Sequence, residues 1–338
     1  MSLSISRRFI KRMTGLFIGV LLLAATGVIA LIWIGSSKLI TPHRRALEPR
    51  HYELIAQPAE YGLDLEPFIV TTHDGIALSA ILATRAKTPG VAEKTRRMAA
   101  RLGHDFDIAA LRPIGTVVFL HGRSGCKEDM LNLAQRFVAA DYRCLVYDGR
   151  AHGMSGGSVC TFGHNETHDL SAVIDQVSGL LKARGENPGQ ICAVGNSLGA
   201  SVILQALPSE TRIDVAVAVS PFASLSEVVI RSAKNTFSPQ TPEWLIVASM
   251  WAGGQRAEFD PFTVSPFRAV RVTTTPVFFT HGALDKVIPV SHSERLYAAA
   301  PEPKRLRVVP NGYHYNILAE GGDALYQEMI EFCLDLIP

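Results

Sequence analysis

The stretch 195–199, Gly-Asn-Ser-Leu-Gly, has the residue types and spacing of a site for nucleophilic chemistry. An apolar run at 191–194 suits a buried parallel strand, and the small residues at 200–207 suit a helix. Gly-x-Ser-x-Gly between a strand and a helix is typical of a nucleophile elbow, in which glycines permit a strained turn that exposes the serine hydroxyl. The N–H of Leu198 would then face a developing oxyanion beside Ser197. A tight turn that happens to contain a serine is the alternative interpretation.

The elements around this stretch predict one large α/β domain. The chain has 338 residues, 47% hydrophobic and 19% charged, and a net charge of +2, which argues against general disorder and against a nucleic-acid partner. Strands alternate with amphipathic helices, which indicates βαβ units and a mostly parallel sheet. The expected strands are a hairpin at 68–72 and 76–84, followed by 115–120, 143–147, 191–194, 215–219, 276–280 and 305–309.

Short motifs near the strand ends carry a family resemblance. They are Thr72-His73-Asp74-Gly75, His121-Gly122, the loop 148–155, Cys160-Thr161-Phe162-Gly163 with Glu166 and Asp169, the elbow, and the stretches 281–285 and 310–314. In this order they resemble the α/β-hydrolase fold, and within it the membrane-anchored serine hydrolases of the Bem46 and ABHD type. The resemblance implies a mostly parallel central sheet flanked by helices at 61–338, a hydrolase activity and no cofactor.

The resemblance also implies a catalytic triad in the chain order serine, aspartate, histidine. Asp285 follows the predicted strand at 276–280, and His314 follows the strand at 305–309. Both loops are expected at the carboxyl edge of the sheet. Ser197 would attack an acyl carbon, His314 would move its proton to the leaving group, and Asp285 would orient the imidazole. A polar surface aspartate and a capping histidine are the alternatives.

The loop after the first parallel strand is expected to complete an oxyanion hole. The backbone N–H of Arg123, after His121-Gly122, would be the second donor beside that of Leu198. The alternative is that Gly122 merely permits a tight turn. Because the donor is main-chain, the side chain of Arg123 is left to face solvent or to meet an anionic substrate.

Other polar residues are expected to be structural. His164 and His168 are four residues apart, but the glutamate between them is misplaced for an H-E-x-x-H motif, so we expect no metal. Glu166 and Asp169 should lie in the first turn of a helix and suit its dipole. Asp148 precedes the elbow, and we expect it to make structural hydrogen bonds rather than to serve as the catalytic acid.

The five cysteines include no C-x-x-C motif, which argues against a zinc ribbon and a dense disulfide scaffold. Cys126 and Cys160 lie in loops near the expected site, where an oxidising compartment would let them pair. We favour two free thiols. Ala151 stands where the resembled family usually has glycine, which questions the local turn.

Two insertions interrupt the strand–helix rhythm. The stretch 85–112 is rich in basic residues and is expected to be a solvated surface insertion, with a segment lying on anionic lipid as the alternative. The stretch 222–268 is too long for a plain crossover and is predicted to form a helical cap over the site. Its apolar residues favour an acyl chain in the pocket, although packing of the cap onto the core would also explain them.

The N-terminus predicts a single-pass membrane anchor. Residues 1–12 are basic, and 13–35 form an uncharged run longer than the roughly 18–20 apolar residues that span a bilayer. A cleaved signal peptide is the alternative, but its apolar region is normally about 7–15 residues. The basic start favours an internal N-terminus and, beyond a linker at 36–60, a catalytic domain on the non-cytoplasmic side.

These features predict a membrane-anchored serine hydrolase that cleaves esters or thioesters of lipid-like or acylated small molecules. Two alternatives stay open. One is a serine peptidase of the prolyl-oligopeptidase kind, and the other is a hydrolase-like domain that binds a ligand without catalysis.

Overall fold

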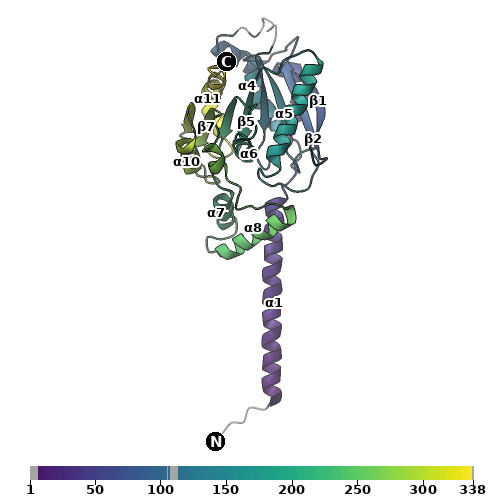
Figure 1. Cartoon of the computed structure of the whole chain (residues 1–338), viewed down its shortest axis with the longest axis vertical. Coiled ribbons are helices and arrows are strands. Elements are labelled where there is room, and N and C mark those ends of the chain that lie inside the picture. The colour runs from purple at the N-terminus through teal and green to yellow at the C-terminus, as the bar shows by residue number, and fades with distance from the viewer. Residues whose placement is uncertain (1–6, 105, 107–112, 337–338) are drawn as a thin grey trace.

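A long helix leads into a body built on a single sheet (Figure 1). The computed structural model describes residues 7–104, 106 and 113–336. Helix α1 (Arg7–Ile40) projects from one side of the body. At about 1.5 Å per residue, a helix of this length extends about 51 Å.

The sheet has eight strands in the order β1-β2-β4-β3-β5-β6-β7-β8. The hairpin of β1 and β2 joins β4 in antiparallel pairing, and the remaining neighbours are parallel. The predicted mostly parallel sheet is confirmed. The strands are β1 (Leu63–Thr71), β2 (Ala77–Arg85), β3 (Gly115–Leu120), β4 (Tyr142–Tyr147), β5 (Gln190–Asn196), β6 (Val215–Val219), β7 (Val277–Gly282) and β8 (Lys304–Val309).

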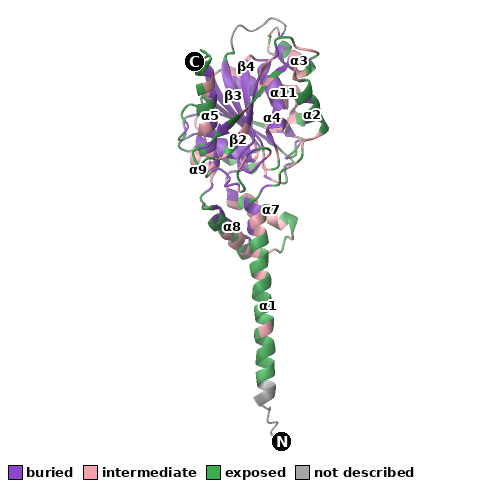
Figure 2. Cartoon of the chain, turned by 90° about the vertical axis from the view of Figure 1, so that its right-hand side faces the viewer, coloured by how far each residue is buried: buried purple, intermediate pink, exposed green. Residues whose placement is uncertain are grey.

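Helices cover both faces of the sheet and enclose two apolar cores (Figure 2). One face carries α5 (Glu166–Ala183), α6 (Leu198–Ala206), α9 (Pro266–Val270) and α10 (Ser291–Ala299). The other carries α3 (Glu93–Arg101), α4 (Lys127–Val138) and α11 (Ile317–Leu334). Because both faces are covered, β3 and β6 are buried along their whole length, as their apolar sequences require.

The stretch 222–268, predicted as a helical cap, contains α7 (Leu225–Thr236), α8 (Glu243–Ala257) and the start of α9. Helices α7 and α8 stand outside the two layers, on the side of the body from which α1 emerges (Figures 1 and 2). Helix α8 crosses α1 and packs against it.

The prediction of a solvated insertion at 85–112 is wrong for its inner face. Within it, Thr95 and Met98 of α3 are fully buried, and Phe106 lies in the same core as α4 and α11. The guanidinium of Arg85 stacks 4.1 Å from the Phe106 ring. The apolar side of α3, rather than the number of its cations, therefore decides where this segment lies. Residues 105 and 107–112 are outside the described residues.

Among the described residues, one helix is long and apolar enough to cross a membrane, over Lys11–Ile40. Helix α1 continues to Ile40, past position 35 where a linker was expected, and α2 (Pro49–Ala56) and the 3-10 helix η1 (Pro58–Tyr61) follow it. Large apolar side chains between Leu16 and Ile34 are exposed, whereas Leu39 and Ile40 are buried in the body. We call residues 16–34 the bare segment of α1 and residues 39–40 its docked segment.

Candidate active site

Ser197 lies at a sharp turn between β5 and α6, with φ 53° and ψ −111°. Its flanking glycines are required by close approach. A Cβ at Gly199 would lie 2.1 Å from the carbonyl oxygen of Leu120, and one at Gly195 would lie 2.4 Å from the amide nitrogen of Ala200. No other residue fits these two positions, so the turn closes tightly against the end of β3.

His314 connects Ser197 to Asp285 through its two ring nitrogens. Nε2 lies 3.0 Å from Oγ of Ser197, and Nδ1 lies 2.7 Å from Oδ2 of Asp285. With Nδ1–H donating to the carboxylate, Nε2 is left to accept the hydroxyl proton. The ends of β5, β7 and β8 thus bring together three side chains whose sequence positions are 117 and 29 residues apart.

The carboxylate of Asp285 is buried and held by several donors. Its Oδ1 accepts hydrogen bonds from the backbone N–H groups of Val287 and Ile288, both at 2.8 Å. Burial alone would raise its pKa, but the hydrogen bonds from His281 and His314 outweigh burial and hold the pKa well below the ordinary value. Asp285 is therefore charged and fixed in position beside the imidazole.

His281 is a residue whose role the sequence did not indicate. It is fully buried at the end of β7, and its Nε2 lies 3.2 Å from Oδ2 of Asp285 and 2.8 Å from the carbonyl oxygen of Ile288. Both neighbours are acceptors, so Nε2 carries the proton, while Nδ1 accepts from the hydroxyl of Ser293 at 2.7 Å. His281 is the first residue of the stretch 281–285, His-Gly-Ala-Leu-Asp, which also contains Asp285, but this stretch does not indicate that the two side chains meet.

The predicted oxyanion donors, the N–H groups of Leu198 and Arg123, stay a prediction, and two observations are compatible with it. Leu198 is the first residue of α6, where a backbone N–H has no acceptor inside the helix. Gly122 lies against the nucleophile, because a Cβ there would be 3.4 Å from the Ser197 Cβ. The amide of Arg123 follows directly, and both residues line the same cavity as Ser197.

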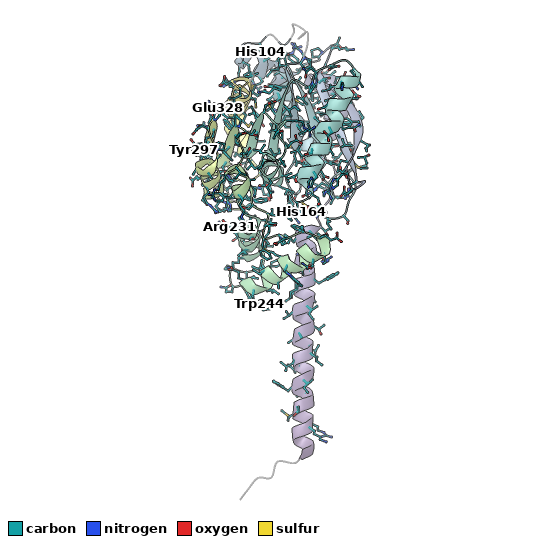
Figure 3. The ribbon with its side chains drawn as sticks, viewed as in Figure 1. His104, His164, Arg231, Trp244, Tyr297 and Glu328 are labelled. Atoms are coloured by element: carbon teal, nitrogen blue, oxygen red, sulfur yellow. The ribbon has the colours of Figure 1, made fainter. Side chains whose placement is uncertain are left out.

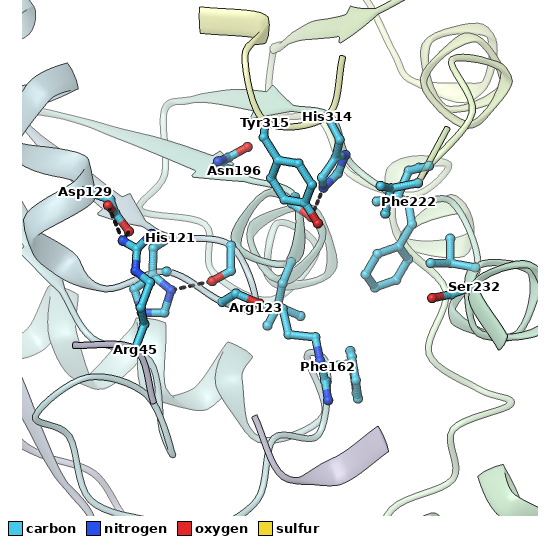
Figure 4. Close-up of a pocket in the computed structure, with 18 of the residues that line it drawn as sticks. Arg45, His121, Arg123, Asp129, Phe162, Asn196, Phe222, Ser232, His314 and Tyr315 are labelled. Atoms are coloured by element: carbon cyan, nitrogen blue, oxygen red, sulfur yellow. Dashed lines mark hydrogen bonds and ion pairs between the residues drawn. The ribbon is translucent and has the colours of Figure 1, made fainter. Parts of the chain in front are cut away.

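The side chain of Arg123 is half-buried and contacts the end of α1 rather than extending into solvent, and its contact with an anionic substrate stays a prediction. Its guanidinium donates to the carbonyl oxygens of Lys38 and Leu39, at 2.6 and 2.5 Å, and lies 4.9 Å from the ring of Phe162 (Figure 4). It thereby satisfies the last carbonyls of α1. Burial lowers its pKa from the ordinary value. No local motif indicates this contact, because it joins segments about 85 positions apart.

The model of the Alpha/beta hydrolase family matches residues 117–328, which is more than half of the chain. The chain belongs to the alpha/beta hydrolase family. The finer resemblance to membrane-anchored serine hydrolases of the Bem46 and ABHD type has no such support and stays a prediction.

Several relatives of this hydrolase are bacterial proteins. The uncharacterized protein YqkD of Bacillus subtilis is 31% identical over 206 residues, which are 59% of this chain and 64% of YqkD, just under two thirds of that relative's length. The putative esterase YitV of the same organism is 23% identical over 214 residues, 59% of this chain and 81% of YitV.

Solved structures share the fold of this hydrolase. The Pyrococcus furiosus esterase Pf2001 superposes with a TM-score of 0.63 at 21% identity, over 88% of this chain and 100% of the esterase. An acylaminoacyl peptidase of Pyrococcus horikoshii gives 0.57 at 13% identity, over 85% of this chain and 44% of the peptidase.

A large cavity of about 1490 Å³ opens on the hydrolase's Ser197 and His314 (Figure 4). Its walls come from the sheet edge, the cap and α1, and on a more polar side from α2, α3, α4 and α11. The cap contributes mainly apolar side chains, and Val287 and Ile288 beside Asp285 continue that surface. The apolar lining includes Phe222, Leu225, Val228, Val229, Phe237, Leu245, Ile246 and Met250.

Asp148 of the hydrolase has a structural role, as expected. Its carboxylate accepts hydrogen bonds from the backbone N–H of Lys127 at 2.7 Å, from the ammonium of Lys127 at 2.9 Å and from the N–H of Met154 at 2.9 Å. Ala151, in place of the usual glycine, keeps the left-handed turn with φ 62°. The loop conformation is therefore retained without glycine.

Glu166 and Asp169 lie in the first turn of α5, as predicted. Glu166 accepts from the N–H of Thr161 and of Gly163, both at 2.7 Å, and so closes the preceding loop. Asp169 forms a buried ion pair with Arg150 at 2.6 Å. All five cysteines are free, including Cys126 and Cys160, which agrees with the favoured interpretation.

One group near the hydrolase's cavity has metal-type donors. His51, Cys126 and Asp129 bring ligand atoms within 4.8 Å of one another. However, both oxygens of Asp129 accept from Arg45, at 2.6 and 2.7 Å, and burial raises the pKa of Cys126 to about 12. A cation would have to displace a guanidinium and deprotonate this thiol, so the donor set fits a metal poorly.

Proposed function

We propose that this protein is a membrane-anchored serine hydrolase that cleaves carboxylic esters or thioesters through an acyl-enzyme on Ser197. The observation that carries the proposal is the continuous chain of contacts from Ser197 through His314 to Asp285, at 3.0 and 2.7 Å. The putative esterase YitV and the esterase Pf2001 are compatible with this activity.

The geometry supports a two-step acyl transfer. Oγ of Ser197 attacks the acyl carbon while Nε2 of His314 takes the hydroxyl proton and then delivers it to the leaving group. Asp285 stabilises the imidazolium, and the N–H groups of Leu198 and Arg123 stabilise the oxyanion. Water, activated by the same imidazole, then releases the acid and regenerates Ser197.

Two features support a lipid-like substrate at a membrane. The cap and Val287 give the cavity an apolar wall suited to an acyl chain. Helix α1 exposes large apolar side chains from Leu16 to Ile34, an unfavourable arrangement in water that a bilayer relieves. The basic residues Arg7, Arg8, Lys11 and Arg12, at the start of α1, favour a catalytic domain on the non-cytoplasmic side.

A fluorophosphonate probe tests the nucleophile. The wild-type protein should be labelled, and Ser197→Ala should lose labelling and at least about 10⁴-fold of kcat on p-nitrophenyl esters. Ser232→Ala is the matched control, because Ser232 lines the same cavity from α7 and should leave labelling intact. Labelling that survives Ser197→Ala, or is absent from the wild type, would favour a binding protein.

A substrate panel tests the bond that is cleaved. We expect turnover of p-nitrophenyl esters to rise with acyl-chain length until the apolar cavity is filled, with acyl-thioesters run beside them. Cleavage of acyl-peptide anilides without cleavage of either ester series would instead support the peptidase alternative.

A further inference from the structure

The three tryptophans of the chain are all exposed at one level of the molecule. Trp33 of α1 and Trp244 and Trp251 of α8 keep 59%, 58% and 60% of their surface accessible. Large aromatic side chains are normally buried in a soluble body, and their exposure is unfavourable there. Tryptophan is, by contrast, the side chain that is enriched where a bilayer meets water.

Helix α8 has an apolar face that packs on the body and a second apolar face that is turned outward. Trp244, Val247 and Trp251 are exposed at spacings of three and four residues, which places them on one face. Ile246 and Met250 are buried on the other. Figure 3 shows Trp244 on the underside of α8, the side toward which α1 extends. An exposed apolar face that carries tryptophans is what a helix lying on a membrane surface turns toward the lipid.

Contacts with α1 fix the level of α8. The helices meet at small residues, and a Cβ at Gly35 would lie 2.6 Å from Oγ of Ser249. Arg256 stacks 3.8 Å from the Trp33 ring and donates to Oγ of Ser36 at 2.6 Å. The exposed apolar segment of α1 ends at Trp33 and Ile34. Helix α8 therefore sits where a membrane containing that segment would end.

The cavity at Ser197 reaches the same level. Besides the catalytic residues, its lining includes Leu31 and Ile34 of α1, which are 54% and 50% exposed, and Phe237 and Leu245 of the cap. A wall made partly of the bare segment of α1 places one end of the cavity beside the lipid that would surround this segment.

We infer that the outer face of α8 lies in the surface of the lipid bilayer, and that acyl esters enter the cavity from the bilayer between α1, α7 and α8. The inference rests on the proposed crossing of the membrane by α1. Lys38 and Arg256 lie beside Phe237 and Trp33, where their charges would meet anionic headgroups. The bilayer would thus cover apolar surface and also deliver the substrate.

Tryptophan fluorescence of the full chain in phosphatidylcholine–phosphatidylglycerol vesicles tests the docking. Three variants each keep one tryptophan and replace the other two with phenylalanine. We expect lipids brominated near the glycerol backbone to quench Trp244 and Trp251 as well as Trp33. Val91→Trp in the tryptophan-free background is the control. Val91 is exposed and lies two residues before α3, a helix at the end of the body away from α8 (Figure 2), so this tryptophan should escape quenching.

The outcomes separate the two proposals. Quenching of Trp33 but not of Trp244 and Trp251 would overturn the docking of α8 while supporting the anchor. Absence of lipid quenching at all three positions would overturn both. Quenching of the Val91→Trp control to the same extent would mean that the bromine label does not report depth, and would remove support for docking.

Enzyme kinetics test the entry route. The double variant Trp244→Ala/Trp251→Ala should lose about tenfold in turnover of a bilayer-embedded long-chain ester, because the interfacial contact is lost. Its turnover of soluble p-nitrophenyl acetate should stay unchanged, as should both activities of Val91→Ala. Equal rates of the double variant and the wild type on the embedded ester would overturn bilayer entry, whereas absence of turnover in the wild type on any ester would instead refute the proposed function.

Discussion

The guanidinium of Arg123 donates a 2.5 Å hydrogen bond to the carbonyl oxygen of Leu39 and so joins the loop beside Ser197 to the end of α1. The backbone N–H of the same arginine is the proposed second oxyanion donor. The position of this donor consequently depends on a side chain that holds the last turn of the N-terminal helix.

We expect Arg123→Gln to lower kcat on a soluble ester by about tenfold, less than the 10²–10³ that accompanies complete loss of an oxyanion donor. KM should change little, because the donor acts on the transition state. Arg256→Gln is the matched control, since Arg256 also holds α1 but contacts Trp33 and Ser36 rather than the catalytic loop. Equal losses in both variants would show that general loosening of α1, and not placement of the donor, is responsible.

His281 should matter to the reaction through Asp285. Replacing it in His281→Phe removes a buried donor to the carboxylate, and a hydrogen bond to a charged group is worth about 1.5–3 kcal/mol, so kcat should fall about ten- to a hundredfold. Ser293→Ala removes only the partner of Nδ1 and should cost much less. Steady-state kinetics, with circular dichroism to verify folding, distinguishes the two, and an unchanged kcat in His281→Phe would contradict this role.

Gly199 of the elbow and Gly122 of the loop after β3 should respond differently to the same substitution. Gly199→Ala places a Cβ 2.1 Å from a backbone oxygen and should cost about 3 kcal/mol or more of stability. Gly122→Ala meets Ser197 and Asn196 only at 3.4 and 3.5 Å, so the protein should fold. Thermal unfolding should therefore show that Gly199→Ala is destabilised and that Gly122→Ala is stable. Any loss of fluorophosphonate labelling in Gly122→Ala would then reflect a slower reaction at Ser197 rather than misfolding. Equal melting temperatures would contradict the strained turn.

His292 predicts a pH dependence of stability. Burial, only partly opposed by Glu227, lowers its pKa to about 4, and its Nδ1 accepts from the N–H of Ala223 at 3.1 Å, which requires a neutral ring. In the unfolded chain this histidine binds a proton below about pH 6.5, whereas in the native protein it binds one only near pH 4. Its stabilising contribution is therefore present above about pH 6.5 and is lost as the pH falls toward 4.

The loss at His292 should be on the order of 3 kcal/mol. His292→Asn, whose amide oxygen replaces Nδ1 as acceptor, should flatten the dependence of the urea-unfolding free energy on pH. His43→Asn, at an exposed position, should leave the wild-type slope unchanged. A slope that is identical in His292→Asn and the wild type would contradict the assignment.

Periodicity and strand-end motifs were enough to predict the architecture. The strands at 115–120 and 215–219 have the predicted bounds, because a parallel strand covered on both faces must be apolar throughout. The meeting of Ser197 and His314 could also be foreseen, since the carboxyl ends of parallel strands share one sheet edge.

The contacts that could not be foreseen join segments with no local signature. Nothing in the residues around Arg123 indicates that its side chain ends α1, and nothing around His281 indicates a second partner for Asp285. Both depend on which strand ends and helices become neighbours in three dimensions. The insertion at 85–112 was misjudged for a related reason, because Met98 and Phe106 are few among many cations and yet decide its burial.

Helix α1 passes from its bare segment into its contacts with Ser249 and Arg256 without a break, so no hinge separates the proposed membrane segment from the body. A body attached to one continuous helix would keep a constant height and orientation relative to the membrane leaflet that it faces. Encounters with substrate would then be a search in two dimensions, governed by the number of molecules per unit area. Vesicles that lack the protein would therefore retain their esters even when they are mixed, at high concentration, with vesicles that contain it.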